Sequence, residues 1–136
     1  MRIDLDVILI DPKPFVTPFR PSEFDHRAEN VVVVHLKGSL VQGPAVSFFL
    51  EQIRLLVSRG VSNFVIDLLE AGYIDSRGVG GLAAAYNAIR DARGKIRYIL
   101  ASKELLSALS KIHLDQVFDI FEDEASALAS FCKVAD

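Results

Sequence analysis

Residues 73–80 run Tyr73-Ile74-Asp75-Ser76-Arg77-Gly78-Val79-Gly80. Ahead of them, the apolar residues 64–66 and Leu68 predict a buried strand. Behind them, apolar residues keep the spacing of a helix, namely Val79, Leu82, Ala83, Tyr86 and Ile89. The stretch is therefore expected to join a strand to a helix, with Asp75 and Ser76 at or near the helix N-cap. Because the first amides of a helix lack internal partners and its dipole is positive there, a phosphate on Ser76 would be favoured.

Strand and helix patterns alternate along the rest of the chain. Besides the strand at 64–68, strands are expected at residues 3–9, 31–34, 96–101 and 117–121. A helix is expected from Pro44 to about Gly60 and another over residues 125–132. A third helix is expected to begin after a Ser102 cap, and its apolar side contains Leu105, Leu106, Leu109 and Ile112. This alternation predicts an α/β domain with a mixed, largely parallel sheet of four to five strands, flanked by about four helices.

The composition fits a single domain over residues 1–136. With 51% hydrophobic and 24% charged residues, the chain can bury a core without disulfides or metals. A net charge of −3 argues against nucleic acid or an anionic membrane surface as the main partner. Cys132 is the only cysteine, so no disulfide can form within the chain. Acidic residues interrupt the N-terminal apolar stretch, which is not typical of a secretory signal. No apolar run reaches the roughly 20 residues that span a bilayer. We therefore expect a cytoplasmic protein without membrane insertion.

A proline-rich loop is expected at residues 11–28, between the first two strand patterns. It contains Pro12, Pro14, Pro18 and Pro21, which favour extended and unpaired backbone. It also contains Phe15, Phe19 and Phe24, whereas disordered segments are usually poor in aromatic residues. Two interpretations stay open: the loop covers apolar surface, or it is a mobile surface loop.

Catalytic and cofactor motifs are weak in this sequence. His26, His35 and His113 are isolated, with no pair at metal-ligand spacing, and His35 inside an apolar strand is expected to be structural. Ser76, His113 and either Asp75 or Asp115 could be imagined as a triad, but no Gly-x-Ser-x-Gly elbow is present. The run Gly78-Val79-Gly80-Gly81 lacks the full spacing of a phosphate-binding loop. We therefore expect no enzyme, no metal and no cofactor.

The residue order around Ser76 resembles the signature of the STAS domain, the fold of the anti-sigma factor antagonists. The signature is an apolar residue, Asp-Ser, a variable small residue, Gly, an apolar residue and Gly, which matches residues 74–80. Other landmarks follow in the same order, namely Gly38-Ser39-Leu40, Ala45, Asp67-Leu68 and Arg93-Gly94-Lys95. The resemblance covers roughly residues 30–132. The chain departs from the family in its long N-terminal loop, in Val41 where an aspartate is common, and in Arg77 where a small residue is usual.

The resemblance implies a regulatory protein-binding module of a partner-switching system. In that family, the unphosphorylated antagonist binds a serine-kinase anti-sigma factor, the kinase phosphorylates the antagonist's serine, and a serine phosphatase reverses the reaction. It implies Ser76 as the phosphorylated residue, Asp75 as its neighbour and Gly78 as the opening of the contact helix. Alternatives are a STAS module of a signalling scaffold or transport complex without serine phosphorylation, and a binder of a small ligand or nucleotide at the Gly78–Gly81 amides.

A wider partner-binding surface is expected on the helix that follows Ser76. Its small residues line one side of the helix, beside the apolar core side, and let a second backbone approach closely. The expected contact residues are Asp75, Ser76, Arg77, Gly78, Gly80, Gly81, Ala84, Ala85 and Ala88, with Ala92 continuing the same side. The alternative is that the small residues pack against a neighbouring helix of the same domain. Neither the partner's identity nor the oligomeric state follows from the sequence.

Overall fold

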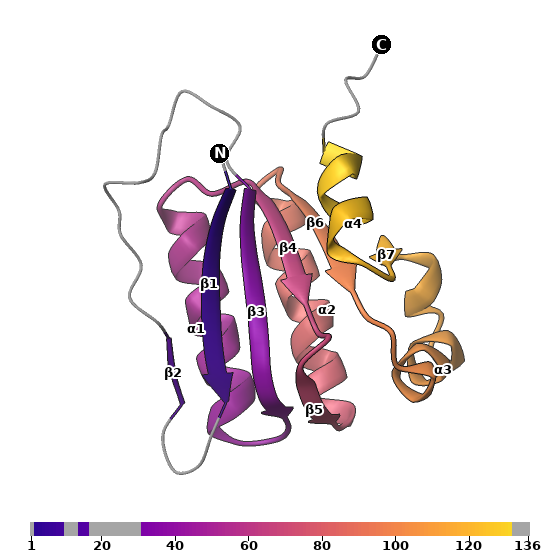
Figure 1. Cartoon of the computed structure of the whole chain (residues 1–136). Coiled ribbons are helices and arrows are strands. Elements are labelled where there is room, and N and C mark those ends of the chain that lie inside the picture. The colour runs from indigo at the N-terminus through magenta and orange to yellow at the C-terminus, as the bar shows by residue number, and fades with distance from the viewer. Residues whose placement is uncertain (1, 10–13, 17–30, 132–136) are drawn as a thin grey trace.

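A single β-sheet organises the part of the chain that the computed structural model describes, which is residues 2–9, 14–16 and 31–131 (Figure 1). The elements follow one another as β1 (Arg2–Leu9), β2 (Phe15–Val16), β3 (Val31–Leu40), α1 (Pro44–Ser58), β4 (Asn63–Asp67), β5 (Ala71–Ile74), α2 (Ser76–Asp91), β6 (Lys95–Ile99), α3 (Lys103–Lys111), the 3₁₀ helix η2 (Leu114–Gln116), β7 (Ile120–Phe121) and α4 (Glu124–Phe131).

The sheet is mixed and largely parallel, as the sequence predicted. Its strand order is β2-β1-β3-β4-β6-β7, and β5 also pairs with β3, beyond β4. All pairs are parallel except the antiparallel pair of β1 with β2. The described residues thus form seven strands, more than the four to five predicted, because β2 and β5 are short and carry no apolar run of their own.

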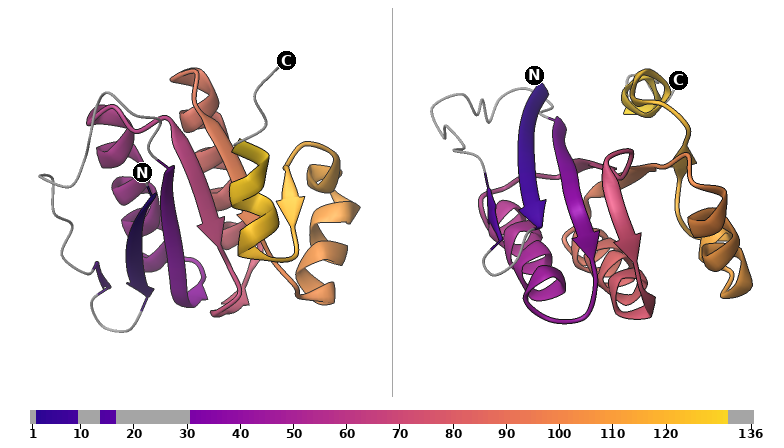
Figure 2. Two further views of the ribbon diagram at one scale, coloured as in Figure 1. Left: turned by 45° about the horizontal axis from the view of Figure 1, so that its top comes forward. Right: turned by 60° about the horizontal axis from the view of Figure 1, so that its bottom comes forward.

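Helices cover the two faces of this sheet unequally. Figure 2 shows α1, α2 and α3 on one side of the sheet and α4 on the other. The pairing order explains this arrangement, because α1 and α2 are the connections that return the chain from β3 to β4 and from β5 to β6. None of the helices in the described ranges combines the length and apolarity needed to cross a membrane.

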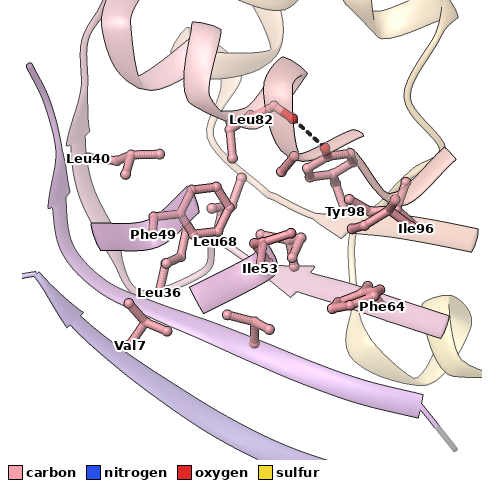
Figure 3. Packing of buried hydrophobic residues seen from close by; sticks show 14 of the residues in the cluster. Val7, Leu36, Leu40, Phe49, Ile53, Phe64, Leu68, Leu82, Ile96 and Tyr98 are labelled. Carbon is pink, nitrogen blue, oxygen red and sulfur yellow. Dashed lines mark hydrogen bonds between the residues drawn. The ribbon is translucent and has the colours of Figure 1, made fainter. Parts of the chain in front are cut away.

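The main hydrophobic core lies between the sheet and α1, α2 and α3 (Figure 3). Phe49, Ile53 and Leu56 of α1 are buried in it, and their spacing places them on one side of the helix. The ring of Tyr98 is also fully buried, and its hydroxyl donates a 2.8 Å hydrogen bond to the carbonyl oxygen of Leu82 in α2. Burial raises the pKa of Tyr98 well above its usual value of 10.0, so this donor stays protonated. A smaller apolar cluster beneath α4 contains Val33, Val65, Ile99 and Ala127.

Several predicted elements differ from the structure at their ends. The strand that leads into α2 is β5, not the strand at 64–68, which ends as β4 at Asp67 and is followed by a turn. Leu106 and Ile112 were expected on the apolar side of α3 but are 42% and 55% exposed, since α3 buries only Leu109 completely. Of the edge strand expected at 117–121, only Ile120 and Phe121 pair with β6.

The proline-rich loop is described only at residues 14–16. Phe15 and Val16 form β2, which pairs with Ile8 and Val7 of β1. Val16 packs against the main core, whereas Phe15 is 49% exposed. Phe19 and Phe24 lie outside the described residues, as do His26 and Cys132. That this loop covers apolar surface therefore stays a prediction. Limited proteolysis would test it, because rapid cutting within residues 11–28 of the folded protein would contradict it.

Candidate functional site

Asp75 forms the N-cap of α2, as predicted. Its Oδ1 accepts a 2.8 Å hydrogen bond from the amide of Gly78. Its Oδ2 accepts a 3.0 Å hydrogen bond from the amide of Gln42, which lies just before α1. These two backbone donors lower the pKa of Asp75 from its usual value of 3.8, so the carboxylate is ionised at neutral pH. One side chain thus caps α2 and ties its start to the start of α1.

Ser76 is the first residue of α2, and it is exposed. It borders a hollow of about 600 Å³ between the starts of α1 and α2. Residues of both helix starts line this hollow, namely Gln42, Gly43, Val46, Ser47, Leu50, Ser76, Arg77, Gly80 and Gly81. A hydroxyl at the mouth of an open hollow is accessible to a second protein, which is the requirement for a modified or recognised serine.

Gly78 allows α2 to begin close to the sheet. Gly78 is buried, and a Cβ at this position would overlap the carbonyl oxygen of Leu40 in β3 and lie 2.8 Å from Ile74 Cγ2. No side chain fits there without a shift of the backbone. At Gly80, by contrast, a Cβ would meet nothing within 4 Å. The two glycines of the motif therefore differ: Gly78 is required by packing, whereas Gly80 leaves open surface beside Ser76.

Besides Gly78, two more small residues of α2 pack inside the domain. Gly81 and Ala85 are buried, and a Cβ at Gly81 would lie 3.0 Å from Val46 Cγ1 of α1. Ala84 and Ala88 are only partly buried, and Gly80 is exposed. Internal packing, which the sequence left open as the alternative, therefore accounts for Gly81 and Ala85. The small residues that remain accessible to a partner are Gly80, Ala84, Ala88 and Ala92.

Two residues that depart from the usual motif flank the site. Arg77 is exposed at the start of α2, and its charge contributes to the lowered pKa of Asp75. Val41 precedes Gln42, whose backbone amide supplies a polar contact to Asp75. Gln42, Gly43 and Ser47 were not identified as site residues from the sequence. Gln42 contributes through its backbone amide, and the lining of a hollow depends on how helices pack, so neither role can be recognised from the residue type.

The site is poor in groups for acid–base catalysis. The residues that line the hollow include no histidine and no carboxylate. Asp75 uses both of its oxygens on backbone amides. His113 lies after α3, where it is exposed in a left-handed conformation with φ 63°. Among the described residues, no hydrogen bond joins His113 to Ser76, Asp75 or Asp115, so these groups do not form a hydrogen-bonded triad.

Comparison with known proteins gives one family and several solved structures. The family model of the STAS domain matches residues 25–127. A candidate anti-sigma factor antagonist from Thermotoga maritima, tm1081, superimposes with a TM-score of 0.68 at 18% identity, covering 74% of this chain and 86% of its own. The anti-sigma factor antagonist SpoIIAA in its unphosphorylated form gives a TM-score of 0.62 at 17% identity over 76% of this chain and 91% of its own.

The Bacillus cell fate determinant SpoIIAA in its phosphorylated form gives a TM-score of 0.61 at 18% identity, covering 79% of this chain and 96% of its own. At these identities, the similarity concerns the fold. No curated protein sequence is similar enough to count as a relative. The predicted α/β fold is thus confirmed both by the family model and by structures of the same architecture.

Proposed function

This chain belongs to the STAS domain family, and from that premise we propose that it is a regulatory protein-binding module of the anti-sigma factor antagonist class. Its partner is a serine-kinase anti-sigma factor, and phosphorylation of Ser76 by that kinase ends the complex. A serine phosphatase restores the binding form. The protein acts in the cytoplasm as the substrate of these enzymes, and it needs no cofactor.

The observation that carries this proposal is the exposed Ser76 at the mouth of the hollow between α1 and α2. The fold similarity to SpoIIAA, a protein solved in both unphosphorylated and phosphorylated forms, supports it. The rival interpretation as a nucleotide binder is weakened by the hydrogen bonds at the helix start. The amide of Gly78 donates to Asp75 Oδ1 and that of Val79 to the Asp75 carbonyl oxygen, so neither is directed at a ligand.

The proposed switch acts through charge and bulk rather than refolding. A phosphate adds about −1.5 to −2 charges at pH 7. Within the domain, the start of α2 stabilises that charge by about 0.3–1 kcal/mol, so the fold tolerates it. Inside an interface, the carboxylate of Asp75 adds like charge, and an anion buried without a partner costs several kcal/mol. Arg77 lies next to Ser76 and softens this repulsion by pairing with the phosphate.

The decisive experiment is phosphorylation by the cognate kinase, with the site mapped by mass spectrometry. Ser76→Ala should bind the kinase constitutively, and Ser76→Asp should bind it weakly, while both variants melt near the wild-type temperature. Ser47, which lines the same hollow from α1, supplies the control, because Ser47→Ala should leave phosphorylation unchanged. Absence of phosphate on Ser76, or equal binding by the two Ser76 variants, would reject the switch. Stable binding of a partner that is not a kinase and never phosphorylates Ser76 would favour a scaffold or transport module instead.

The accessible side of α2 defines the contact surface of this proposal. Ala88 is partly buried and lies about three turns beyond Ser76. Ala88→Arg should abolish kinase binding and leave the fold intact, because a long charged side chain keeps the two backbones apart. A far-ultraviolet dichroism spectrum and a melting curve separate this result from unfolding. If the variant unfolds, Ala88 is needed for packing inside the domain.

A further inference from the structure

A second polar cluster lies on the face of the sheet opposite to α1 and α2. His35 of β3 projects on the same face as Val33, which packs beneath α4, because alternate residues of a strand share a face. Its Nδ1 lies 2.7 Å from Asp67 Oδ2 of β4, and its Nε2 lies 2.8 Å from Asp4 Oδ1 of β1. The side chains of His35 and Asp67 are 17% and 10% exposed, so the cluster is largely sheltered from solvent.

Helix α4 brings a third group to this cluster. Glu124 is the first residue of α4, and it is half-buried. One ligand atom from each of His35, Asp67 and Glu124 lies within 4.8 Å of the other two. The amide of Leu69 donates a 2.9 Å hydrogen bond to Asp67 Oδ1, which orients the carboxylate while Oδ2 faces the imidazole. Three separate elements thus bring one imidazole nitrogen and two carboxylates close to one another.

We propose that His35, Asp67 and Glu124 bind a divalent transition-metal ion of the Zn²⁺ type. Imidazole nitrogen and carboxylate oxygen are both ligands that Zn²⁺ accepts, and three protein ligands leave one position for water. The Asp4 carboxylate adds a second feature of such sites, because metal-bound histidines commonly donate their other ring N–H to a carboxylate. On binding, the ion replaces the proton on Nδ1, which passes to solvent.

The donor set also selects among ions. Mg²⁺ prefers oxygen ligands in near-octahedral geometry, so an imidazole at the centre of the site disfavours it. The expectation that His35 has only a structural role is revised by this proposal. The sequence does not place these residues together, since His35 stands 31 positions from Asp4 and 32 from Asp67. The site is separate from Ser76, and its existence does not depend on the proposed function.

Calorimetric titration of the chelator-treated protein with Zn²⁺ tests the proposal. All samples carry Cys132→Ser, so that the thiol cannot bind the ion. The parent protein should bind one equivalent and gain thermal stability, whereas Mg²⁺ should do neither. His35→Gln should abolish binding and Glu124→Gln should weaken it strongly. Asp4→Asn should reduce the affinity by about 10- to 100-fold, as expected for a group that orients a ligand.

The exposed His113 provides the matched control. His113→Gln should bind Zn²⁺ like the parent protein, because no described carboxylate cluster surrounds His113. Dichroism spectra in chelator verify that each variant is folded. Since Glu124 lies at the start of a helix, Glu124→Gln decides the outcome if His35→Gln unfolds. The proposal is overturned if the parent protein shows no saturable binding, or if His35→Gln and Glu124→Gln bind as it does.

Discussion

The start of α2 around Asp75 and Ser76, called the Ser76 junction, and the cluster of His35, Asp67 and Glu124, called the His35 cluster, both depend on an aspartate. The two aspartates differ in their hydrogen-bond partners and in their exposure to solvent. Asp75 is accessible and receives two backbone amides, one of them only three residues along the chain. Asp67 is 8% exposed and faces the ring of His35. The first arrangement caps a helix at the surface, beside the exposed Ser76. The second joins neighbouring strands of the sheet and shields its charges, so the two regions should respond differently to substitution and to pH.

The largest expected effect is at Gly78, where α2 meets β3. Gly78→Ala should lower the free energy of unfolding by about 3 kcal/mol, because the added methyl overlaps the Leu40 carbonyl oxygen and α2 must shift away from β3. Urea denaturation followed by dichroism measures the loss. Gly80→Ala is the matched control, since a methyl there meets nothing within 4 Å.

In a helix interior, alanine is favoured over glycine by about 1 kcal/mol, so Gly80→Ala should stabilise the protein slightly. Equal effects of the two substitutions would show that the close approach of α2 to β3 is not what requires glycine at position 78. The Ser76 junction would then owe its shape to Asp75 alone.

A smaller difference is expected between the two aspartates. Asp67→Asn should lower the free energy of unfolding by about 1.5 kcal/mol, because a largely buried charge-assisted bond to His35 becomes a neutral one. Asp75→Asn should lower stability by less, since asparagine still caps the helix through its one oxygen, although its NH2 group cannot accept the hydrogen bond from the amide of Gln42. The same denaturation experiment compares them in chelator. A larger loss for Asp75→Asn would show that Asp75, rather than the shielded Asp67, contributes more to stability.

The smallest effects are expected in the dependence of stability on pH, where the two regions should differ in sign. Burial lowers the pKa of His35, but hydrogen bonds and charges from Asp4 and Asp67 outweigh it and raise the pKa above 6.5. The stabilisation by protonated His35 is complete below the unfolded pKa, and it is lost as pH rises through the folded value. Asp6 lies on the adjoining strand β1, Lys37 lies on β3 two residues beyond His35, and Glu124 approaches His35 from α4.

Asp75 has a pKa below 3.8, so its contribution is present above that pH and disappears only as acid protonates the folded carboxylate. Melting temperatures measured in chelator across pH should therefore fall in the alkaline direction for the wild type and less so for His35→Gln. Asp75→Asn should change only the acid limb. An alkaline limb that His35→Gln leaves unchanged would contradict the charge assigned to His35.

The same contrast explains how much the sequence could predict. The cap at Asp75, the buried side of α1 and the cap at Ser102 follow from short-range patterns, and the structure has all three. The strand β5 was missed because its residues, with exposed Gly72 and Tyr73, lack the apolar alternation that marks a strand. The His35 cluster and the hollow beside Ser76 depend on strand register and helix packing, which bring together residues far apart in the chain.

The bond from Asp75 to the amide of Gln42 has a kinetic consequence for any protein that docks at the Ser76 junction. Because the Asp75 carboxylate joins the starts of α1 and α2, the two sides of the hollow are fixed relative to each other before a partner protein arrives. Little loop entropy remains to be lost on association, so docking proceeds as a nearly rigid-body collision at a rate set by diffusion and orientation. The proposed phosphorylation of Ser76 should then change the lifetime of the complex more than its rate of formation.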